Sequence, residues 1–182
     1  NGLTWTQEDV VIVPNEGGQN VMSVSLLRLA DGRIALFYAR KNSLTDCRPY
    51  LRFSEDEAKT WSEPKLCIEE VGYYVLNNDR VVQLDSGRLI VPVALHNTPA
   101  YEKPDWDGTI LCYLSDDAGQ SWRRSKSRLV GKSADGKRVT LQEPGVIGLK
   151  DRRLMMFCRT RSGCQYVSYS EDDGDTWSEF RP

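Results

Sequence analysis

One eight-residue phrase occurs three times in this chain, and its spacing constrains the fold more than any other feature. The copies are Ser54–Trp61, Ser115–Trp122 and Ser170–Trp177. They share the form S-x-D-x-G-x-T-W, with Ala58 once in place of the glycine and Ser121 once in place of the threonine, and Gly2-Leu3-Thr4-Trp5 matches the tail of a fourth copy. The tryptophans at 5, 61, 122 and 177 are 56, 61 and 55 residues apart. A nearly constant step of this size indicates a repeat architecture.

Each repeat contains four segments with the composition of β-strands. Apolar runs enter and leave a short turn rich in Asp and Gly, which predicts a hairpin in each repeat. These hairpins lie at 26–37, 81–91 and 146–157. A third strand precedes each S-x-D box, at 50–54, 111–115 and 166–170, and a fourth strand follows each tryptophan. Four antiparallel strands in one period are the size of a propeller blade.

The repeats predict an all-β chain that forms part of a β-propeller with four-stranded antiparallel blades. We expect an outer strand at 1–13, blades at 14–70 and 71–131, and an incomplete blade at 132–182. These segments make about three blades, whereas propellers close with four to eight. The remaining blades would come from further sequence or from a second copy, because in a homodimer the leading strand at 5–13 would complete the partner's last blade.

The boxes themselves are turn devices. Their Asp side chain can accept backbone N–H bonds across the turn, and their Gly supplies a backbone conformation with positive φ. The Trp offers a large apolar face that packs beside the neighbouring strand. We therefore expect the boxes to build the fold and to take no direct part in chemistry.

The composition excludes several classes of protein. Charged residues make up 27% of the chain and the net charge is −2, so we expect no nucleic-acid partner and no membrane partner. The five cysteines, at 47, 67, 112, 158 and 164, are odd in number and lack metal-type spacing, which predicts reduced thiols. His96 is the single histidine and cannot form a metal site alone. Neither a nucleotide-binding motif nor a His-rich metal motif is present, so we expect neither a cofactor nor a metal.

Because successive strands run antiparallel, the loops that connect them alternate between two ends of the molecule. The hairpin turns and the boxes share one end. The blade connections and the loops between second and third strands share the other. That second end collects polar residues at 16–20, 40–42, 46–48, 77–80, 96–97, 101–107, 142–143 and 159–161. Because convergent polar groups at a concave mouth are the usual form of a ligand site, we expect the site at this end.

At these residues the chain resembles the sialidase family, whose six-bladed propellers carry the same boxes. The similar stretches are 26–33 with 38–46, 81–93, and 143–146 with 154–160. They cover nearly the whole chain and about half of a sialidase propeller. The resemblance implies a six-bladed ring, a glycan substrate, and a secreted or periplasmic location.

The resemblance also implies roles for individual residues. Asp46 lies where the family has its acid/base aspartate, and Glu143 lies where it has the glutamate that activates a tyrosine nucleophile. Arg159 matches a ligand of the sialic acid carboxylate, and Arg161 is a weaker candidate for that role. Bidentate guanidinium groups suit a planar carboxylate, and sialidases differ from most glycosidases in using a tyrosine nucleophile.

Three features depart from the family pattern. Met22 stands near the position of an early family arginine, and the tyrosine nucleophile and a third arginine belong to later blades that this chain lacks. A polar cluster at 77–80 has no standard family role, and its arginine or Arg48 is the candidate to replace the missing one. The additional candidates for substrate binding are Arg48, Asn78, Asp79, Arg80 and His96.

Three functions are compatible with this pattern. The first is a sialidase-like glycoside hydrolase, favoured by Asp46, Glu143 and Arg159. The second is a propeller that binds a carbohydrate or a protein without turnover, favoured by the missing arginine. The third is a related enzyme that acts on another glycan. Because the tyrosine nucleophile would lie in absent blades, we expect no robust hydrolysis from residues 1–182 alone.

Overall fold

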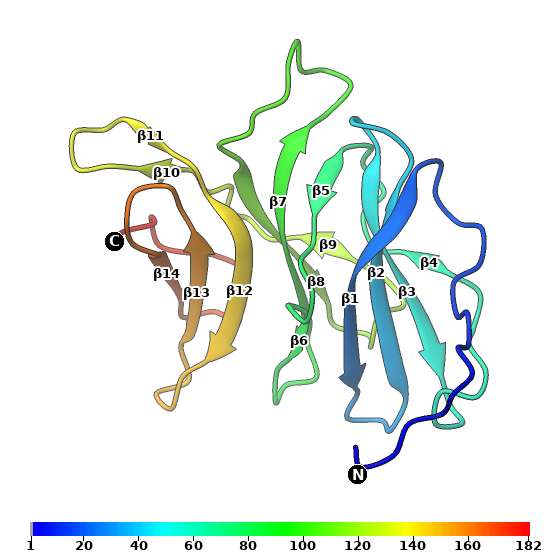
Figure 1. Cartoon of the computed structure of the whole chain (residues 1–182). Helices are drawn as coiled ribbons and strands as arrows, with labels where there is room; N and C mark the ends of the chain where they lie inside the picture. The colour runs from blue at the N-terminus through cyan, green and yellow to red at the C-terminus, as the bar shows by residue number, and fades with distance from the viewer. Residues whose placement is uncertain (1) are drawn as a thin grey trace.

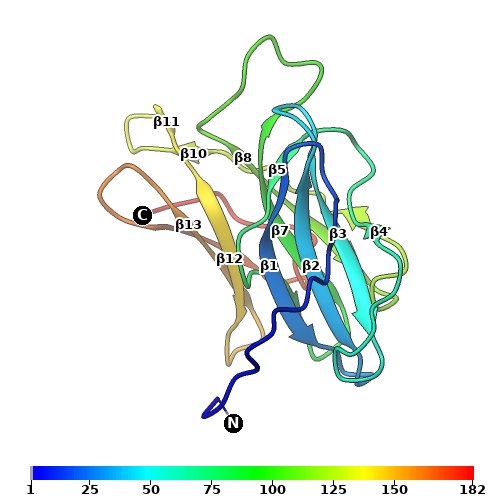
Figure 2. The same cartoon turned by 45° about the vertical axis from the view of Figure 1, so that its right-hand side comes forward.

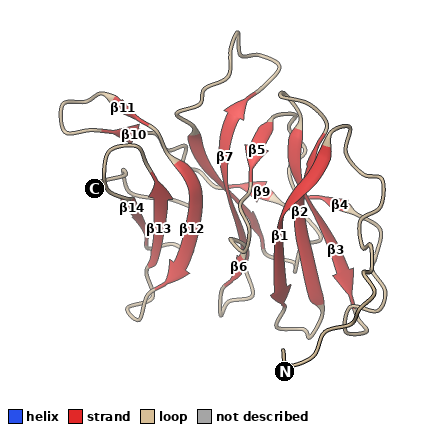
Figure 3. Cartoon of the chain, in the orientation of Figure 1, coloured by secondary structure: helices blue, strands red, loops and turns tan. Residues whose placement is uncertain are grey.

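The computed structural model describes residues 2–182, and within them every regular element is a β-strand (Figure 3). The first group of strands is β1 (Asn20–Arg28), β2 (Ile34–Lys41), β3 (Cys47–Ser54) and β4 (Lys65–Leu66). The second is β5 (Tyr73–Val75), β6 (Val82–Gln83), β7 (Leu89–Asn97), β8 (Thr109–Ser115) and β9 (Arg123–Arg124). The third is β12 (Gln142–Gly148), β13 (Leu154–Arg159) and β14 (Tyr166–Ser170), preceded by a small hairpin of β10 (Gly131–Lys132) and β11 (Arg138–Val139). The all-β prediction is confirmed.

The three groups repeat one antiparallel register. Each second strand begins opposite the serine of its box, in the pairs Ile34 with Ser54, Leu89 with Ser115 and Leu154 with Ser170. The predicted hairpins and third strands are thus all present. The register also places the hairpin turns and the boxes at one end of the sheets, as the alternation of strands predicted, and the loops between second and third strands at the other.

The groups fan out side by side and do not close into a ring (Figures 1 and 2). The short strand β5 joins the first two groups, because Tyr73 pairs in parallel with Cys47 of β3 while β5 runs antiparallel to β7. The third group forms a separate sheet of β12, β13 and β14. It packs against the second group through buried side chains.

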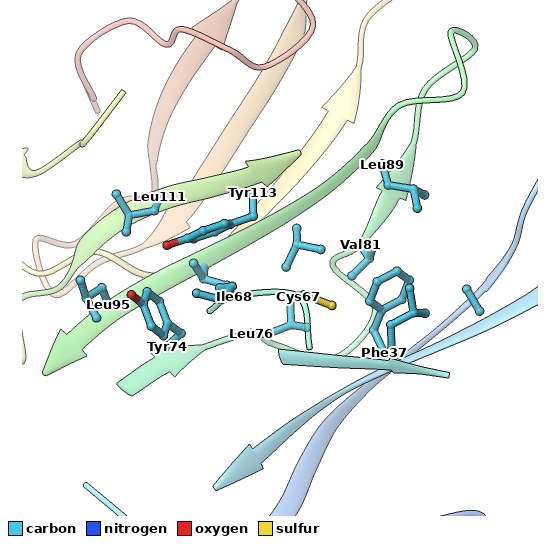
Figure 4. Packing of buried hydrophobic residues seen from close by; sticks show 14 of the residues in the cluster. Phe37, Cys67, Ile68, Tyr74, Leu76, Val81, Leu89, Leu95, Leu111 and Tyr113 are labelled. Atoms are coloured by element: carbon cyan, nitrogen blue, oxygen red, sulfur yellow. The ribbon is translucent and has the colours of Figure 1, made fainter. Parts of the chain in front are cut away.

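Two buried clusters fill the spaces between the groups. The first includes Phe37, Leu51, Leu89, Tyr74 and Tyr113, and the last two rings meet edge to face at 6.0 Å and 90° (Figure 4). The second includes Ile90, Ala94, Cys112, Leu114, Met156 and Trp177. Both clusters draw side chains from neighbouring groups, so each group depends on the next for its core.

Two of the box tryptophans, Trp122 and Trp177, pack across these boundaries. Trp122 of the second box meets Phe37 of the first group edge to face, at 6.1 Å and 84°. Trp177 of the third box is 8% exposed and lies in the cluster that contains Ile90 of the second group. Burying about 200 Å² of indole contributes roughly 5 kcal/mol of transfer free energy, so this packing outweighs the hydrogen bonds of the box.

The box aspartates hold the turns as expected. In the third box, Asp172 Oδ1 accepts a hydrogen bond from Thr176 N at 2.8 Å, and Oδ2 accepts one from the Thr176 hydroxyl at 2.6 Å. The Ser170 hydroxyl donates to the same carboxylate at 2.9 Å. Asp56 and Asp117 repeat this pattern in the other two boxes. These contacts account for the box as a structural device.

The edges of the fold differ from the prediction. Residues 2–13, predicted as an outer strand, form no strand, because a strand needs a pairing partner and no described segment supplies one; residue 1 lies outside the described part. The last sheet, predicted to be incomplete, has its outer edge occupied by its own chain. Arg181 forms an isolated bridge with Val167, and Ser178 N donates to Tyr169 O at 2.8 Å.

The described residues contain neither a disulfide nor the side-chain cluster of a metal site. All five cysteines are free, and four of them (47, 67, 112 and 158) are buried. Residues 2–182 contain no group of three or more His, Cys, Asp or Glu side chains that could hold a metal ion. The same residues include no helix able to cross a membrane.

Candidate functional site

The end opposite the boxes carries Asp46 and the Glu143–Arg159 pair, whereas residues 77–80 lie between β5 and β6, partway along β7. The end opposite the boxes is formed by the 42–46 loop before β3, the 98–108 loop between β7 and β8, the start of β12 and the end of β13 (upper end in Figure 1). We call this end the mouth.

Glu143 lies on a bulge in β12 at the mouth. The pairing of β12 with β13 shifts between Gln142 and Gly145, and Glu143 has φ 56°. Its Oε1 forms an ion pair with Arg159 Nη1 at 2.7 Å, and Arg159 Nη2 also donates to Gln142 Oε1. Bulges re-aim side chains, and a non-glycine residue with positive φ is often found at functional sites. The structure thus brings these two predicted residues together.

Asp46 is held by its own neighbours at the start of β3. Asn42 Nδ2 donates to Asp46 Oδ2 at 2.9 Å, and Arg48 Nε donates to Oδ1 at 2.7 Å. Burial alone would raise the pKa of Asp46, but these hydrogen bonds and the charges of Arg48 and Arg40 lower it below its usual value. Asp46 is therefore an ionised carboxylate, and Arg48, which also donates to Glu69 O at 3.1 Å, serves Asp46 in this arrangement.

Arg80 crosses from the second group to the third. Its guanidinium lies 5.2 Å from the centre of the Phe157 ring, and its Cδ lies 3.2 Å from the position that a Cβ on Gly145 would occupy. Its Nε is buried and has no hydrogen-bond partner among the described residues. A buried unpaired donor calls for a ligand or water. Of the two arginines considered as replacements for the missing one, Arg80 has the unsatisfied donor.

The other polar residues of the 77–80 cluster have three different surroundings. Asp79 has φ 57° and its N–H donates to Val24 O at 3.1 Å, which interrupts the inner strand of the second group between β5 and β6. Asn78 is exposed, whereas the Oδ1 of Asn77 is buried without a partner in the described chain. The cluster therefore adds a second unpaired buried polar atom near Arg80 in sequence.

His96 and Arg161 lie in different surroundings from the ion pair. His96 is only 3% exposed, and its Nδ1 lies 2.9 Å from Asp105 O, so the structure places this ring inside the fold, behind the 98–108 loop. Burial lowers the pKa of His96, with Asp105 opposing that effect. Arg161 is exposed on the turn after β13.

Met22 packs as an apolar residue where the family pattern has an arginine. It is partly buried against Ala39, Cys47 and Tyr73. It also lines a groove of about 440 Å³ on the open face of the first group, together with Val21, Leu36 and Trp61. This position therefore offers no side chain that could bind the carboxylate of a substrate.

A charged cluster on the first group was not foreseen from the sequence. Glu16 accepts a hydrogen bond from the Tyr38 hydroxyl at 2.7 Å and one from Arg52 Nη2. Burial and the Glu16 charge raise the pKa of Tyr38 to about 12. Since Tyr38 is only 1% exposed, this phenol is closed to a substrate and the cluster is structural.

Trp106, at the mouth, was not predicted from the sequence as a candidate for the site. It is 51% exposed, and its carbonyl accepts a hydrogen bond from Gln142 Nε2 at 3.4 Å. The sequence does contain a signal for it, because Trp106 is the one tryptophan that does not belong to the repeat period.

Comparison with known proteins identifies the fold. The family model described as a BNR repeat-like domain matches residues 1–182. A protein of unknown function from Dyadobacter fermentans has a TM-score of 0.73 at 22% identity, over 98% of this chain and 54% of that one. A Hadza microbial sialidase has a TM-score of 0.63 at 20% identity, over 87% of this chain and 33% of that one. An α-L-arabinofuranosidase from Fusarium graminearum has a TM-score of 0.67 at 16% identity, over 92% and 49%.

These values show a shared fold. This chain spans about half or less of the length of the three structures. The similarity to the sialidase and BNR superfamily that the sequence indicated, for part of a propeller, is confirmed.

Proposed function

Because this chain belongs to the family of BNR repeat-like domains, we propose that it is part of a six-bladed propeller that hydrolyses a glycan at the mouth. In this proposal each group of strands is one four-stranded blade, with blades at 14–70, 71–131 and 132–182. The repeated register of the box serines supports the blade assignment.

The ligand proposed for the mouth is an acidic sugar. Arg159 is half-exposed beside Glu143, and the Nε of Arg80 is buried without a partner in the described chain. Guanidinium groups bind planar carboxylates through paired hydrogen bonds. Arg80 takes over the task of the missing arginine in this proposal, while the exposed residues Arg161, Asn78 and Asp79 provide further polar groups.

Two carboxylates carry the proposed chemistry. Glu143 is the base that activates a tyrosine supplied by another blade, and Arg159 orients it through the 2.7 Å ion pair. Asp46 is the proton-transfer group at the leaving oxygen. Because the Asn42 and Arg48 contacts keep Asp46 ionised, a bound substrate has to displace Arg48 before Asp46 can carry a proton.

The observation that carries the proposal is the Glu143–Arg159 pair on a bulge with positive φ. A positive φ at a glutamate costs about 1–3 kcal/mol. The rest of the fold offsets this cost, and Arg159 holds the Glu143 carboxylate at the bulge through the ion pair.

A second candidate function is glycan binding without turnover, and the state of Asp46 favours it. The lowered pKa of Asp46 suits a carboxylate that accepts hydrogen bonds from a sugar better than it suits a proton donor. Hydrolysis and binding are separated by assaying the full-length protein that contains this sequence on aryl sialosides and aryl arabinofuranosides, and measuring binding of the free sugars. Turnover by the unmodified protein that is lost in Glu143→Gln supports the hydrolase. Sugar binding by the unmodified protein without turnover rejects the hydrolase and supports the binding module.

A further inference from the structure

The 98–108 loop between β7 and β8 is fixed at both of its sides. The Asp105 N–H donates to His96 O at 2.7 Å, which ties the loop to the end of β7. The Leu141 N–H donates to Asp107 O at 2.7 Å, and Arg138 Nη2 donates to Asp105 Oδ2 at 2.7 Å. The loop is therefore held against the segment that enters the third group as well as against its own strand.

Trp106 lies in this fixed loop with half of its side chain open to solvent. The centre of its ring system is 5.6 Å from the His96 ring, tilted by 35°, and 6.3 Å from the Tyr73 ring at 81°. His96 and Tyr73 are buried, at 3% and 8% exposure, whereas Trp106 is 51% exposed. The two buried rings fix the orientation of the indole, and the part that they leave uncovered faces solvent.

Hydrogen bonds connect Trp106 with the charged pair at the mouth. Gln142 Nε2 donates to Trp106 O at 3.4 Å, and Gln142 Oε1 accepts from Arg159 Nη2. Arg159 in turn forms the 2.7 Å ion pair with Glu143. The backbone of Trp106, the Arg159 guanidinium and the Glu143 carboxylate thus belong to one hydrogen-bonded network.

A single exposed aromatic residue requires no explanation by itself. Trp106 differs from that ordinary case in three ways: buried rings fix it, its loop is anchored to two groups of strands, and it joins the candidate residues through Gln142. An aromatic side chain with few free torsions that is already held in place loses little entropy on binding, which suits it to ligand recognition.

We propose that the exposed indole of Trp106 stacks against one sugar ring of the ligand and selects glycans whose ring has an apolar face. One face of many sugar rings presents C–H groups, and these are attracted to the negative face of an aromatic ring. The assignment rests on the proposed function, since it places Trp106 beside the Glu143–Arg159 pair in the same glycan site. His96 and Tyr73 act as positioning residues for the indole.

The test follows the tryptophans directly. The full-length protein is labelled with 5-fluorotryptophan, and the fluorine resonances of this chain are assigned by replacing each tryptophan with phenylalanine in turn. Sialic acid and L-arabinose are then titrated separately. Trp5 is the matched control, because it is 85% exposed and belongs to the segment before β1. The N-terminal end of the chain lies at the opposite end of the sheets from the mouth (Figure 1).

We expect one of the sugars to shift the Trp106 resonance and leave the Trp5 resonance unmoved. Trp106→Ala should weaken binding of that sugar roughly tenfold, the scale of a central aromatic contact, and Trp106→Phe should restore part of it. Because the readout is binding, a folded Trp106→Ala variant with unchanged fluorine signals at the other tryptophans is a valid comparison.

The remaining outcomes separate this inference from the proposed function. Turnover that depends on Glu143, with a silent Trp106 resonance and unchanged affinity in Trp106→Ala, overturns the inference and leaves the hydrolase intact. A Trp106 shift without turnover supports stacking and rejects the hydrolase. Equal shifts at Trp5 and Trp106, or no shift and no turnover with any sugar, overturn the inference.

Discussion

Ser23 of β1 and Glu143 of β12 occupy the same position of the same bulge in two different sheets. In β1 the pairing shifts between Met22, opposite Ala39, and Ser25, opposite Phe37; in β12 it shifts between Gln142, opposite Arg159, and Gly145, opposite Phe157. The φ angles at the two bulges are 61° and 56°. The backbone device is repeated while the side chain changes, so the bulge is part of the scaffold and the glutamate is an addition to it.

This equivalence provides a structural test of Glu143. We expect Glu143→Gln to lower turnover of the active substrate by about 10²–10⁴-fold with little change in affinity, because the change removes a base and almost no volume. Glu143→Ser installs the side chain that the equivalent bulge already carries, so it should leave the melting temperature nearly unchanged and abolish turnover. Steady-state kinetics and calorimetry on both variants check this, and unchanged turnover in either variant would reject the assignment.

The unsatisfied Nε of Arg80 predicts a role in recognising charge. Arg80→Met keeps most of the apolar contact with Phe157 and removes the guanidinium. We expect affinity for a carboxylate-bearing sugar to fall by roughly 10–100-fold, the scale of a hydrogen bond to a charged group. Isothermal titration with sialic acid and with its methyl ester measures the effect. Equal losses for the acid and the ester would show that Arg80 acts through packing and does not bind the carboxylate.

The sequence predicted those parts of the fold that depend on local signals. Turn residues and box serines fixed the register, and alternation of antiparallel strands placed the candidate residues at one end. Register follows from turn type and from the buried face of each strand, both of which are local. The link between β3 and β5 through Cys47 and Tyr73 depends on how two groups pack, and no local pattern encodes it.

The site was predicted less completely for the same reason. The resemblance to sialidases singled out Glu143 and Arg159, which lie on adjacent strands, but it did not predict the ion pair between them. Two other features depend on side-chain geometry in the folded protein. Arg48 donates its Nε–H to Asp46, and the Nε of Arg80 has no hydrogen-bond partner in the described chain. His96 was expected to face the ligand because it is polar and near a loop, but its ring is covered by that loop.

The box aspartates should affect stability and leave chemistry untouched. Asp172→Ala removes the acceptor of the Thr176 N–H and hydroxyl. A loss of about 1 kcal/mol corresponds to a melting temperature lower by about 2–4 °C in a protein of this size. Glu171→Ala, at the neighbouring exposed position of the same box, is the control and should change the melting temperature by less than 1 °C, on the order of an ordinary surface substitution. Loss of activity at full stability in Asp172→Ala would contradict the structural role.

Stability should also depend on acid through the same boxes. The Ser121 hydroxyl and N–H hydrogen bonds lower the pKa of Asp117 from 3.8 to about 2. A carboxylate with a lowered folded pKa stabilises the protein above its unfolded pKa, and that contribution disappears as the pH falls through the folded value. The urea midpoint should therefore decrease as the pH is lowered from about 4 toward 2. Asp117→Asn should be less stable than the unmodified protein at pH 7 and show a smaller decrease over this range; equal decreases would show that other groups control the acid transition.

Gly108 closes the loop that carries Trp106, and its replacement tests how that loop is held. Gly108 has φ +77°, and a Cβ there would lie 2.5 Å from Leu141 O and 3.0 Å from His96 Cε1. Gly136, in the turn between β10 and β11, has φ +80° and nothing within 4 Å of its Cβ position, so Gly136→Ala measures the backbone strain alone, about 1 kcal/mol. Gly108→Ala should cost clearly more than Gly136→Ala, because the clash displaces either the Leu141 carbonyl or the His96 ring on which the indole rests. Thermal unfolding compares the stabilities of the two variants. A shift of the 5-fluorotryptophan resonance at position 106 in Gly108→Ala, and not in Gly136→Ala, reports the displacement. Equal stabilities with an unmoved resonance would show that the loop does not depend on this contact.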